Sequence, residues 1–209
     1  MAYFPLFVEL AGRRVLVVGG GRVALRKVEK LLPYEPEVVV VAPEIRPELE
    51  NLQGVTLVRR SFFPDLLSGA ALVIAAAGDT GVNHEVSTLC REQGIPVNVV
   101  DDPAACTFFF PALVKRGPLS VGISTGGASP CAAAYIRGQV DDLVPERFET
   151  ILELLRALRP VVRASISDEQ LRAEFFARLL RQWVGNQIPV TMEAAHRALQ
   201  MFLQEGEES

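Results

Sequence analysis

Arg14-Val-Leu-Val-Val-Gly-Gly-Gly-Arg-Val-Ala-Leu-Arg-Lys-Val-Glu-Lys-Leu31 is the most informative segment of the sequence for predicting the fold. It begins with an apolar, mostly β-branched run, passes through three glycines and continues with apolar residues at helical spacing. Within it, Gly19-x-Gly21-x-x-Ala24 matches the glycine fingerprint of a dinucleotide-binding turn. We therefore expect a strand, a tight turn and a helix, with Pro33 marking the helix end.

Each small residue of this fingerprint has a physical task. Gly19 permits the turn from strand to helix, Gly21 leaves room for a pyrophosphate, and Ala24 lets the helix pack closely on the strand. The amides at the helix start then face the phosphates, aided by the helix dipole. A purely structural glycine turn is the alternative, and the strand before and helix after the glycines favour NAD or NADP binding.

Composition limits the other possibilities. The chain has 209 residues, of which 49% are hydrophobic, so it can bury a large domain or a main domain with an appendage. Its net charge of −4 gives no support to nucleic-acid binding. The longest apolar run, residues 70–77, is too short to span a membrane. Three widely spaced cysteines form no disulfide framework, so we expect a cytoplasmic protein.

Apolar runs alternate with helical segments along the first half of the chain. Strands are expected at residues 38–41, 55–58, 71–77 and 97–100, a helix at 82–92, and a short strand or clip at 4–8. This alternation predicts an α/β fold with a Rossmann-like, doubly wound parallel sheet. Ligands of such sheets bind at the carboxyl ends of the strands, which here carry the glycine turn, Gly78-Asp79 and Asp101.

The composition changes after residue 111. Two strands at 112–115 and 119–124 and a helix at 131–143 predict a small α+β segment. The remainder is helical, with one helix at 146–158 ended by Pro160, another at 168–183 capped by Ser167, and a last one opened by Thr191. We expect three domains, 1–111, 112–145 and 146–209.

Asp101 is the main catalytic candidate. It follows a strand that we expect to be central in the sheet, where a bound nicotinamide would lie. A carboxylate there can accept a proton while a hydride leaves for NAD. The alternative is a plain strand-end residue that caps the turn at Pro103, a role that Asp102 suits equally well.

A second candidate is the loop Ser124-Thr-Gly-Gly-Ala-Ser-Pro130. Ser124, Thr125, Gly126 and Ser129 can form an anion cradle from hydroxyls and backbone amides at a helix start. The alternative is a simple connection in which Ser129 caps the helix and Pro130 takes its first position. His84 and His196 belong to no metal motif, so we expect no metal site.

The residue that would bind the cofactor ribose departs from the usual pattern. An acid normally follows the second strand, and here Glu44 lies beyond Pro43, about 20 residues past the fingerprint. Glu44 can bind the ribose hydroxyls and repel a 2′-phosphate, which favours NAD over NADP. Arg46 nearby weakens that inference.

Taken together, several stretches resemble the precorrin-2 dehydrogenase family, which includes the siroheme synthase N-terminal module. They are Phe4-Pro-Leu-Phe7, Val17 to Lys27, Asn98-Val-Val-Asp101, Phe108 to Pro111 and Ser124 to Pro130. The resemblance covers roughly residues 3–145, and the helical tail matches only in general character.

The resemblance implies NAD-dependent oxidation of precorrin-2 to sirohydrochlorin, with Asp101 as proton acceptor. Some members also insert ferrous iron, which would use the same Asp101. It further implies homodimers formed through residues 112–145, and a tetrapyrrole cleft that includes Thr125. The cofactor contacts that it implies are Gly21, Arg22, Val23, Ala24, Pro43, Glu44, Ala77 and Gly78.

Precorrin-2 carries eight carboxylates, which Arg116 and Arg137 can pair with in bidentate fashion. The alternative for both arginines is ordinary solvated surface. The competing function for the whole chain is a non-catalytic, NAD-binding redox sensor, which would use the glycine turn and leave Asp101 and the Thr125 loop without chemistry.

Overall fold

The computed structural model describes residues 4–207. The chain divides into two compact units, of which the first is Phe4–Phe110 and the second begins at Pro111. Each unit has its own hydrophobic core, and each is described by itself below.

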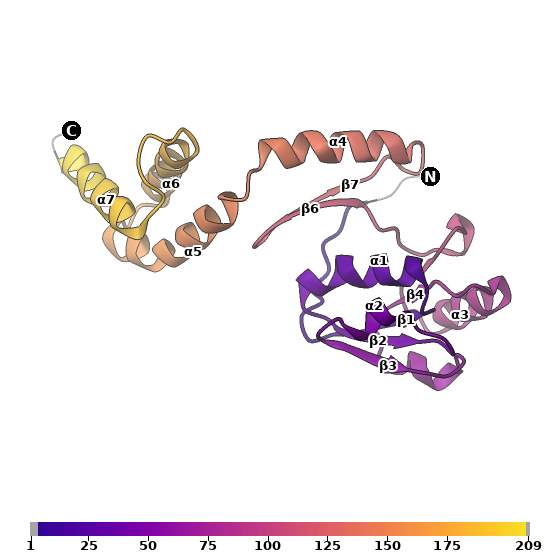
Figure 1. Ribbon diagram of the computed structural model, residues 1–209. Coiled ribbons are helices and arrows are strands. Elements are labelled where there is room, and N and C mark those ends of the chain that lie inside the picture. Colours follow the sequence, from indigo (N-terminus) through magenta and orange to yellow (C-terminus); the bar gives the residue numbers. More distant parts are fainter. Residues whose placement is uncertain (1–3, 208–209) are drawn as a thin grey trace. The chain divides into compact units, whose positions relative to one another are not determined.

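A five-stranded parallel sheet forms the centre of the first unit (Figure 1). Its strands are β1 (Arg14–Val18), β2 (Glu37–Val41), β3 (Val55–Val58), β4 (Leu72–Ala75) and β5 (Val97–Val99). They lie in the order β3-β2-β1-β4-β5, and every neighbouring pair is parallel. The order reverses at β1, which is the point where open α/β sheets bind their ligands. The expected Rossmann-like fold is confirmed.

Helices cover both faces of this sheet because its strands are apolar on both sides. Val15 and Val17 of β1 join one core with helix α1 (Arg22–Leu31). Leu16 and Val18 join the opposite core with helix α3 (Thr80–Glu92). Shorter helical turns complete the connections: η1 (Leu32–Tyr34), α2 (Pro47–Glu50), η2 (Pro64–Leu67) and η3 (Pro103–Ala105).

Strand β5 lies at the edge of the sheet, so the expectation that Asp101 follows a central strand is wrong. The chain after η3 returns along β5 instead of adding a sixth strand. The Thr107 amide donates to the Val97 carbonyl (2.8 Å), and the Val97 amide donates to Thr107 Oγ1 (2.7 Å). This return segment covers the exposed edge of the sheet, which would otherwise invite pairing with another chain.

Of the two expectations for residues 4–8, a short strand or a clip, the strand is absent. These residues have no regular structure, and Phe4 and Phe7 are 88% and 75% exposed. Pro5 lacks an amide donor, which disfavours pairing at that position. The chain that follows is anchored by Leu10, which packs in one core of the sheet, and by the Gly12 amide, which donates to the Glu35 carbonyl (2.9 Å).

The second unit begins with an antiparallel hairpin of β6 (Ala112–Arg116) and β7 (Leu119–Ile123), followed by helix α4 (Pro130–Leu143). Val114 is the one fully buried residue of this hairpin, and none of the residues of α4 is buried. The segment therefore has little core of its own.

Three helices follow and pack around a shared core: α5 (Phe148–Ser165), α6 (Glu169–Val184) and α7 (Met192–Glu207). Trp183 is fully buried there, and its indole Nε1 donates to the Pro189 carbonyl (3.0 Å). Phe175 and Phe202 contact each other edge to face, with ring centroids 5.5 Å apart.

Two expectations about these helices are wrong. Helix α5 continues through Pro160 to Ser165 instead of ending there. Leu158 and Val162 on either side of the proline are fully buried, and burying two such side chains offsets the roughly 3 kcal/mol cost of an interior proline. Helix α6 is capped by Asp168, not Ser167, since Asp168 Oδ1 accepts from the Leu171 amide (2.9 Å).

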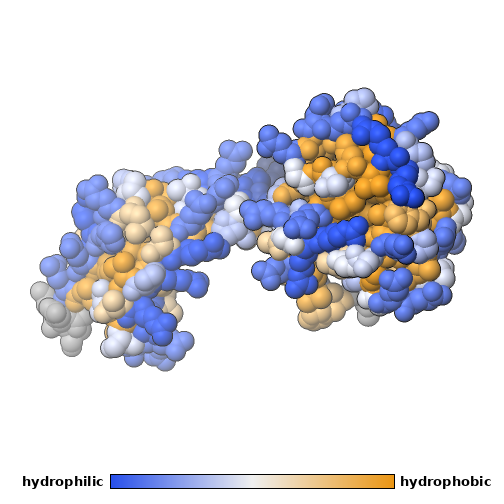
Figure 2. Space-filling model, turned by 90° about the horizontal axis from the view of Figure 1, so that it is seen from below, coloured by the Kyte–Doolittle hydropathy of each residue, from blue (hydrophilic) through white to orange (hydrophobic). Residues whose placement is uncertain are grey.

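Apolar residues also gather at the surface of both units (Figure 2). Within residues 4–207, no helix combines the length and apolar character needed to cross a membrane.

Candidate active site

The glycine turn is locked against the ends of two neighbouring strands. The Gly19 amide donates to the Val41 carbonyl of β2 (2.8 Å), and the Ala76 amide beyond β4 donates to the Val18 carbonyl (2.7 Å). Gly19 has a φ of +128°, and a Cβ there would lie 2.2 Å from the Ala76 carbonyl oxygen. Only glycine fits this position, as the sequence fingerprint predicts.

The loop after β2 packs closely against Gly20 of the same turn. A Cβ on Gly20 would lie 2.3 Å from the Glu44 carbonyl oxygen. The Arg46 amide donates to the Gly20 carbonyl (3.0 Å). The backbone of Glu44 therefore lies directly against the glycine turn, and Pro43 and Glu44 are both exposed. Sequence reasoning assigned no task to Gly20, because the fingerprint leaves that position free.

The start of α1 fits a dinucleotide phosphate. Gly21 is the N-cap and provides no side chain to bond the first amides of the helix. A Cβ on Gly21 would meet no atom within 4 Å, so the space beside this position is open. Arg22 and Val23 are exposed at this entrance, while Ala24 is fully buried against the sheet. These residues could hold the pyrophosphate of NAD(P).

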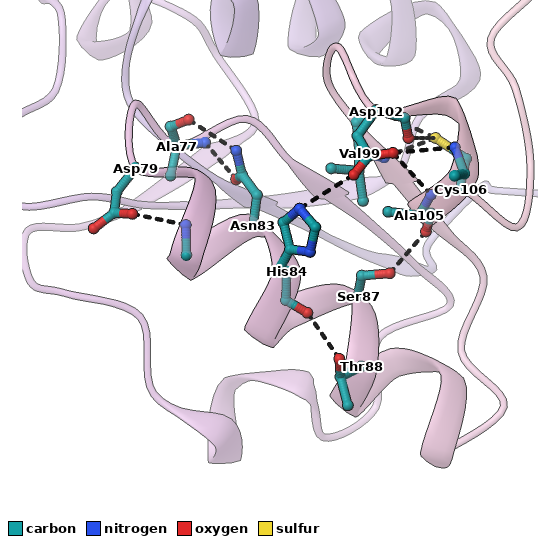
Figure 3. A network of polar contacts seen from close by, with 12 residues as sticks. Ala77, Asp79, Asn83, His84, Ser87, Thr88, Val99, Asp102, Ala105 and Cys106 are labelled. Carbon is teal, nitrogen blue, oxygen red and sulfur yellow. Dashed lines mark hydrogen bonds and ion pairs between the residues drawn. The ribbon is translucent and has the colours of Figure 1, made fainter.

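The end of β4 is held by an asparagine that the sequence did not single out. Asn83 of α3 accepts from the Ala77 amide (2.9 Å) through Oδ1 and donates to the Ala77 carbonyl (3.0 Å) through Nδ2. Its side chain is buried, and Figure 3 shows the paired contacts. Asp79 caps α3 by accepting from the Gly81 amide (2.7 Å). Gly78 lies exposed between these two anchors.

Asp101 occupies an exposed turn directly after β5. Its φ of +60° is in the left-handed region, which aspartate and asparagine tolerate better than most other residues. The cap of η3 is instead Asp102, whose Oδ1 accepts from the amides of Ala104 (3.1 Å) and Ala105 (3.2 Å). Because Asp102 takes the structural role, the Asp101 carboxylate is left exposed at the carboxyl edge of the sheet.

Two other titratable side chains, His84 and Lys27, contact the residues beside this turn. His84 Nε2 lies 3.2 Å from Asp102 Oδ2 (Figure 3). Lys27 of α1 is half-buried, and its Nζ donates to Asn98 Oδ1 (3.1 Å). Burial and the neighbouring Lys30 lower the pKa of Lys27, and the negative charge of Asp101 acts in the opposite direction.

The Thr125 loop lies in the second unit, and its hydroxyls are used within the loop. Thr125 Oγ1 donates to the Ser129 carbonyl (3.0 Å) and accepts from the Ser129 amide (3.2 Å). Ser124 Oγ accepts from the Gly126 amide (3.2 Å). Ser129 Oγ caps α4 by accepting from the Ala132 amide (3.1 Å), with Pro130 at the first position. The capping interpretation is confirmed, and tetrapyrrole binding by these residues stays a prediction.

The two candidate arginines differ in their surroundings. Arg116 Nη2 donates to Asp141 Oδ1 (2.7 Å), and its Nε donates to the Val144 carbonyl (3.1 Å). It therefore ties β6 to the end of α4. Arg137 is exposed on α4. Binding of substrate carboxylates by either arginine stays a prediction.

Comparison with solved structures supports this fold. The structure described as "SirC, precorrin-2 dehydrogenase" matches with a TM-score of 0.73 at 22% sequence identity, over 97% of this chain and 100% of that one. The likeness extends over both units of the chain and bears on the fold alone.

Sequence relatives point to the same group of proteins. "Siroheme synthase" of Thioalkalivibrio sulfidiphilus is 42% identical over 183 residues, which are 86% of this chain and 37% of that protein. "Siroheme synthase" of Ectopseudomonas mendocina is 41% identical over 189 residues, 90% of this chain and 41% of that protein. The chain thus spans about two fifths of the length of these relatives.

Two family models match consecutive parts of the chain. Residues 116–143 match the model "Sirohaem biosynthesis protein central". Residues 6–112, more than half of the chain, match the family "Putative NAD(P)-binding". The resemblance to the precorrin-2 dehydrogenase and siroheme synthase group is confirmed, and the chain belongs to this NAD(P)-binding family.

Proposed function

We propose that this chain oxidises precorrin-2 to sirohydrochlorin with NAD as hydride acceptor. One observation carries the proposal: the glycine turn after β1 and the exposed Asp101 after β5 lie at the same carboxyl edge of one parallel sheet. The names of the relatives and of the structural neighbour, siroheme synthase and precorrin-2 dehydrogenase, support the choice of substrate.

The separate roles of the cofactor and of the protein follow from the chemistry of a dehydrogenation. The oxidation removes a hydride and a proton from the macrocycle, and bound NAD supplies the hydride acceptor. The protein has to hold the two reactants in place and accept the proton. Asp101 is the proposed proton acceptor, since its carboxylate is not used for capping. Gly19, Gly21, Arg22, Val23 and Ala24 form the proposed phosphate site.

The loop after β2 favours NAD over NADP. Glu44 lies next to the glycine turn, where its carboxylate would repel a 2′-phosphate. Arg46, the cation that could offset this repulsion, pairs with Glu48 (2.5 Å). We therefore propose Pro43, Glu44, Ala77 and Gly78 as the cofactor contacts beyond the pyrophosphate.

A homodimer is part of the same proposal. Helix α4 has no buried residue, and Tyr135, Ile136 and Leu143 on it are 70%, 43% and 76% exposed. An apolar surface of this kind on a segment with little core is typical of an unfilled interface. We propose that residues 112–145 pair with a second copy, that the Thr125 loop and Arg137 contribute to the tetrapyrrole cleft, and that the protein acts in the cytoplasm. Sedimentation should show a dimer, and Tyr135→Asp should shift it towards a monomer.

The activity is tested by incubating the purified chain with precorrin-2 and NAD and following sirohydrochlorin by absorbance. The proposal predicts product formation with NAD and slower formation with NADP. Tight NAD binding without product would favour the redox sensor instead. Iron insertion, which the same Asp101 would serve, is tested by adding ferrous iron to sirohydrochlorin with and without enzyme.

A further inference from the structure

The turn that carries Asp101 is pinned by the thiol of Cys106. Cys106 Sγ lies 3.2 Å from the Val99 carbonyl and 3.3 Å from the Asp102 carbonyl, so its one proton is donated to either or shared by both. The same sulfur accepts from the Val99 amide (3.1 Å). One side chain therefore bonds the residue before the turn and the residue after it, as Figure 3 shows.

A second layer of contacts holds Cys106 from the opposite side. Asn98 is buried, and its Nδ2 donates to the Phe108 carbonyl (3.1 Å) and contacts Cys106 Sγ (3.5 Å). Its Oδ1 accepts from Lys27 Nζ (3.1 Å). The Lys27 ammonium also lies 4.1 Å from the centre of the Phe110 ring, a cation–π contact. A continuous polar chain thus runs from α1 across β5 to the Asp101 turn.

We infer that Lys27, Asn98 and Cys106 form a positioning set that fixes the Asp101 carboxylate for proton transfer. The inference rests on the proposed function for the identity of the reaction. It does not need any of the three side chains to touch the substrate. Cys106 bonds the backbone on both sides of the turn, Asn98 contacts Cys106, and Lys27 donates to Asn98.

The position of the Asp101 turn at the edge of the sheet explains why such a set is needed. A turn at a sheet edge has a strand on one side only: the Val100 amide donates to the Ala75 carbonyl (2.9 Å) of β4. On the outer side there is no further strand within the described residues, and the Cys106 contacts take its place. A carboxylate displaced by about 1 Å can cost about 100-fold in rate, so the contacts at Cys106 should be visible in the chemical step.

The test compares Cys106→Ala, which removes the pin, with Cys106→Ser, which keeps a donor and an acceptor. Cys90→Ala is the matched control, since Cys90 is fully buried among apolar side chains of the same unit and its thiol makes no hydrogen bond within the described residues. Turnover of precorrin-2, affinity for NAD and amide hydrogen exchange of residues 97–107 are measured for each variant. Lys27→Met keeps a long apolar side chain beside Phe110 and removes the ammonium group. It therefore tests the polar contact that lies farthest from the Asp101 turn in this network.

Cys106→Ala should lower kcat by at least about 10-fold, with KM and the Kd of NAD changed by less than about 2-fold. Cys106→Ser should retain kcat within about 3-fold. Lys27→Met should also lower kcat, and Cys90→Ala should lower the melting temperature while leaving kcat within about 2-fold. Exchange of the turn amides should accelerate in Cys106→Ala and stay close to wild type in Cys106→Ser.

Wild-type kcat in Cys106→Ala, or equal losses of kcat in the alanine and serine variants, would overturn the inference while leaving the proposed function intact. If the wild-type chain itself makes no sirohydrochlorin, the proposed function fails. Hydrogen exchange then still decides the positioning role, because unchanged exchange of residues 97–107 in Cys106→Ala would refute it without any reference to activity.

Discussion

Substituting Gly21 by alanine separates cofactor binding from folding. Gly21 has a φ of −88°, which alanine adopts freely, and an added Cβ would meet no atom within 4 Å. The folded chain can therefore accept the methyl group. The methyl group would stand at the N-cap of α1, next to the amides where the pyrophosphate is proposed to bind.

Gly21→Ala should change the free energy of unfolding much less than the affinity for NAD. Alanine is a poorer N-cap than glycine by up to about 1 kcal/mol. It also restricts the unfolded chain, which stabilises by about 0.4–1 kcal/mol. The net change in unfolding free energy should stay within about 1 kcal/mol. A phosphate pushed off the helix start loses at least one charge-assisted hydrogen bond, about 1.5–3 kcal/mol, so the Kd of NAD should rise about 10- to 100-fold.

Calorimetric titration of NAD and thermal unfolding of the same preparations measure both quantities. Gly138→Ala in α4 is the matched control, because a Cβ there also meets no atom within 4 Å. It should leave the NAD affinity unchanged and stabilise its helix by about 0.5–1 kcal/mol. An unchanged Kd of NAD in Gly21→Ala would refute the placement of the pyrophosphate at this turn.

The structure also predicts the effects of two further substitutions and the reactivity of one cysteine. Gly19→Ala should destabilise the first unit by about 2–5 kcal/mol, because alanine would combine a positive φ with a clash against the Ala76 carbonyl. A melting temperature within about 3 °C of wild type would contradict this prediction. Asn83→Ala should lower stability by about 1–3 kcal/mol and weaken NAD binding, because two backbone groups of Ala77 lose their partner; titration and unfolding measure both. Burial raises the pKa of Cys90 to about 11, so at pH 8 only ~0.1% of it is thiolate and it should resist a thiol reagent that labels the exposed Cys131. Mass spectrometry measures the two labelling rates. Equal rates for Cys90 and Cys131 would contradict the prediction and would show that the core around Cys90 opens.

Much of the fold was predictable because the sheet is buried on both faces. Continuous apolar runs such as residues 38–41 occur where helices cover both sides of a parallel strand. The fingerprint residues were predictable for a related reason, since a left-handed turn against the Ala76 carbonyl leaves glycine as the only choice at Gly19. These features depend on local geometry that a single stretch of sequence encodes.

Other features depend on contacts between distant residues and could not be read from local patterns. Nothing near Asp101 indicates that β5 is an edge strand, because this depends on the return of residues 106–108 along it. Asn83 and Cys106 are ordinary in sequence, and only the fold brings them to Ala77 and Asp102. The continuation of α5 through Pro160 likewise depends on burial against α6 and α7.

The most direct test of the account is precorrin-2 turnover by Asp101→Asn. Asparagine is the appropriate replacement because it tolerates the left-handed backbone at this position, whereas alanine would add about 1–2 kcal/mol of strain. If Asp101 accepts the proton, Asp101→Asn should bind NAD within about 2-fold of wild type and form sirohydrochlorin at least about 100-fold more slowly. Turnover at the wild-type rate would contradict the account, because the oxidation would then proceed without the carboxylate at the end of β5.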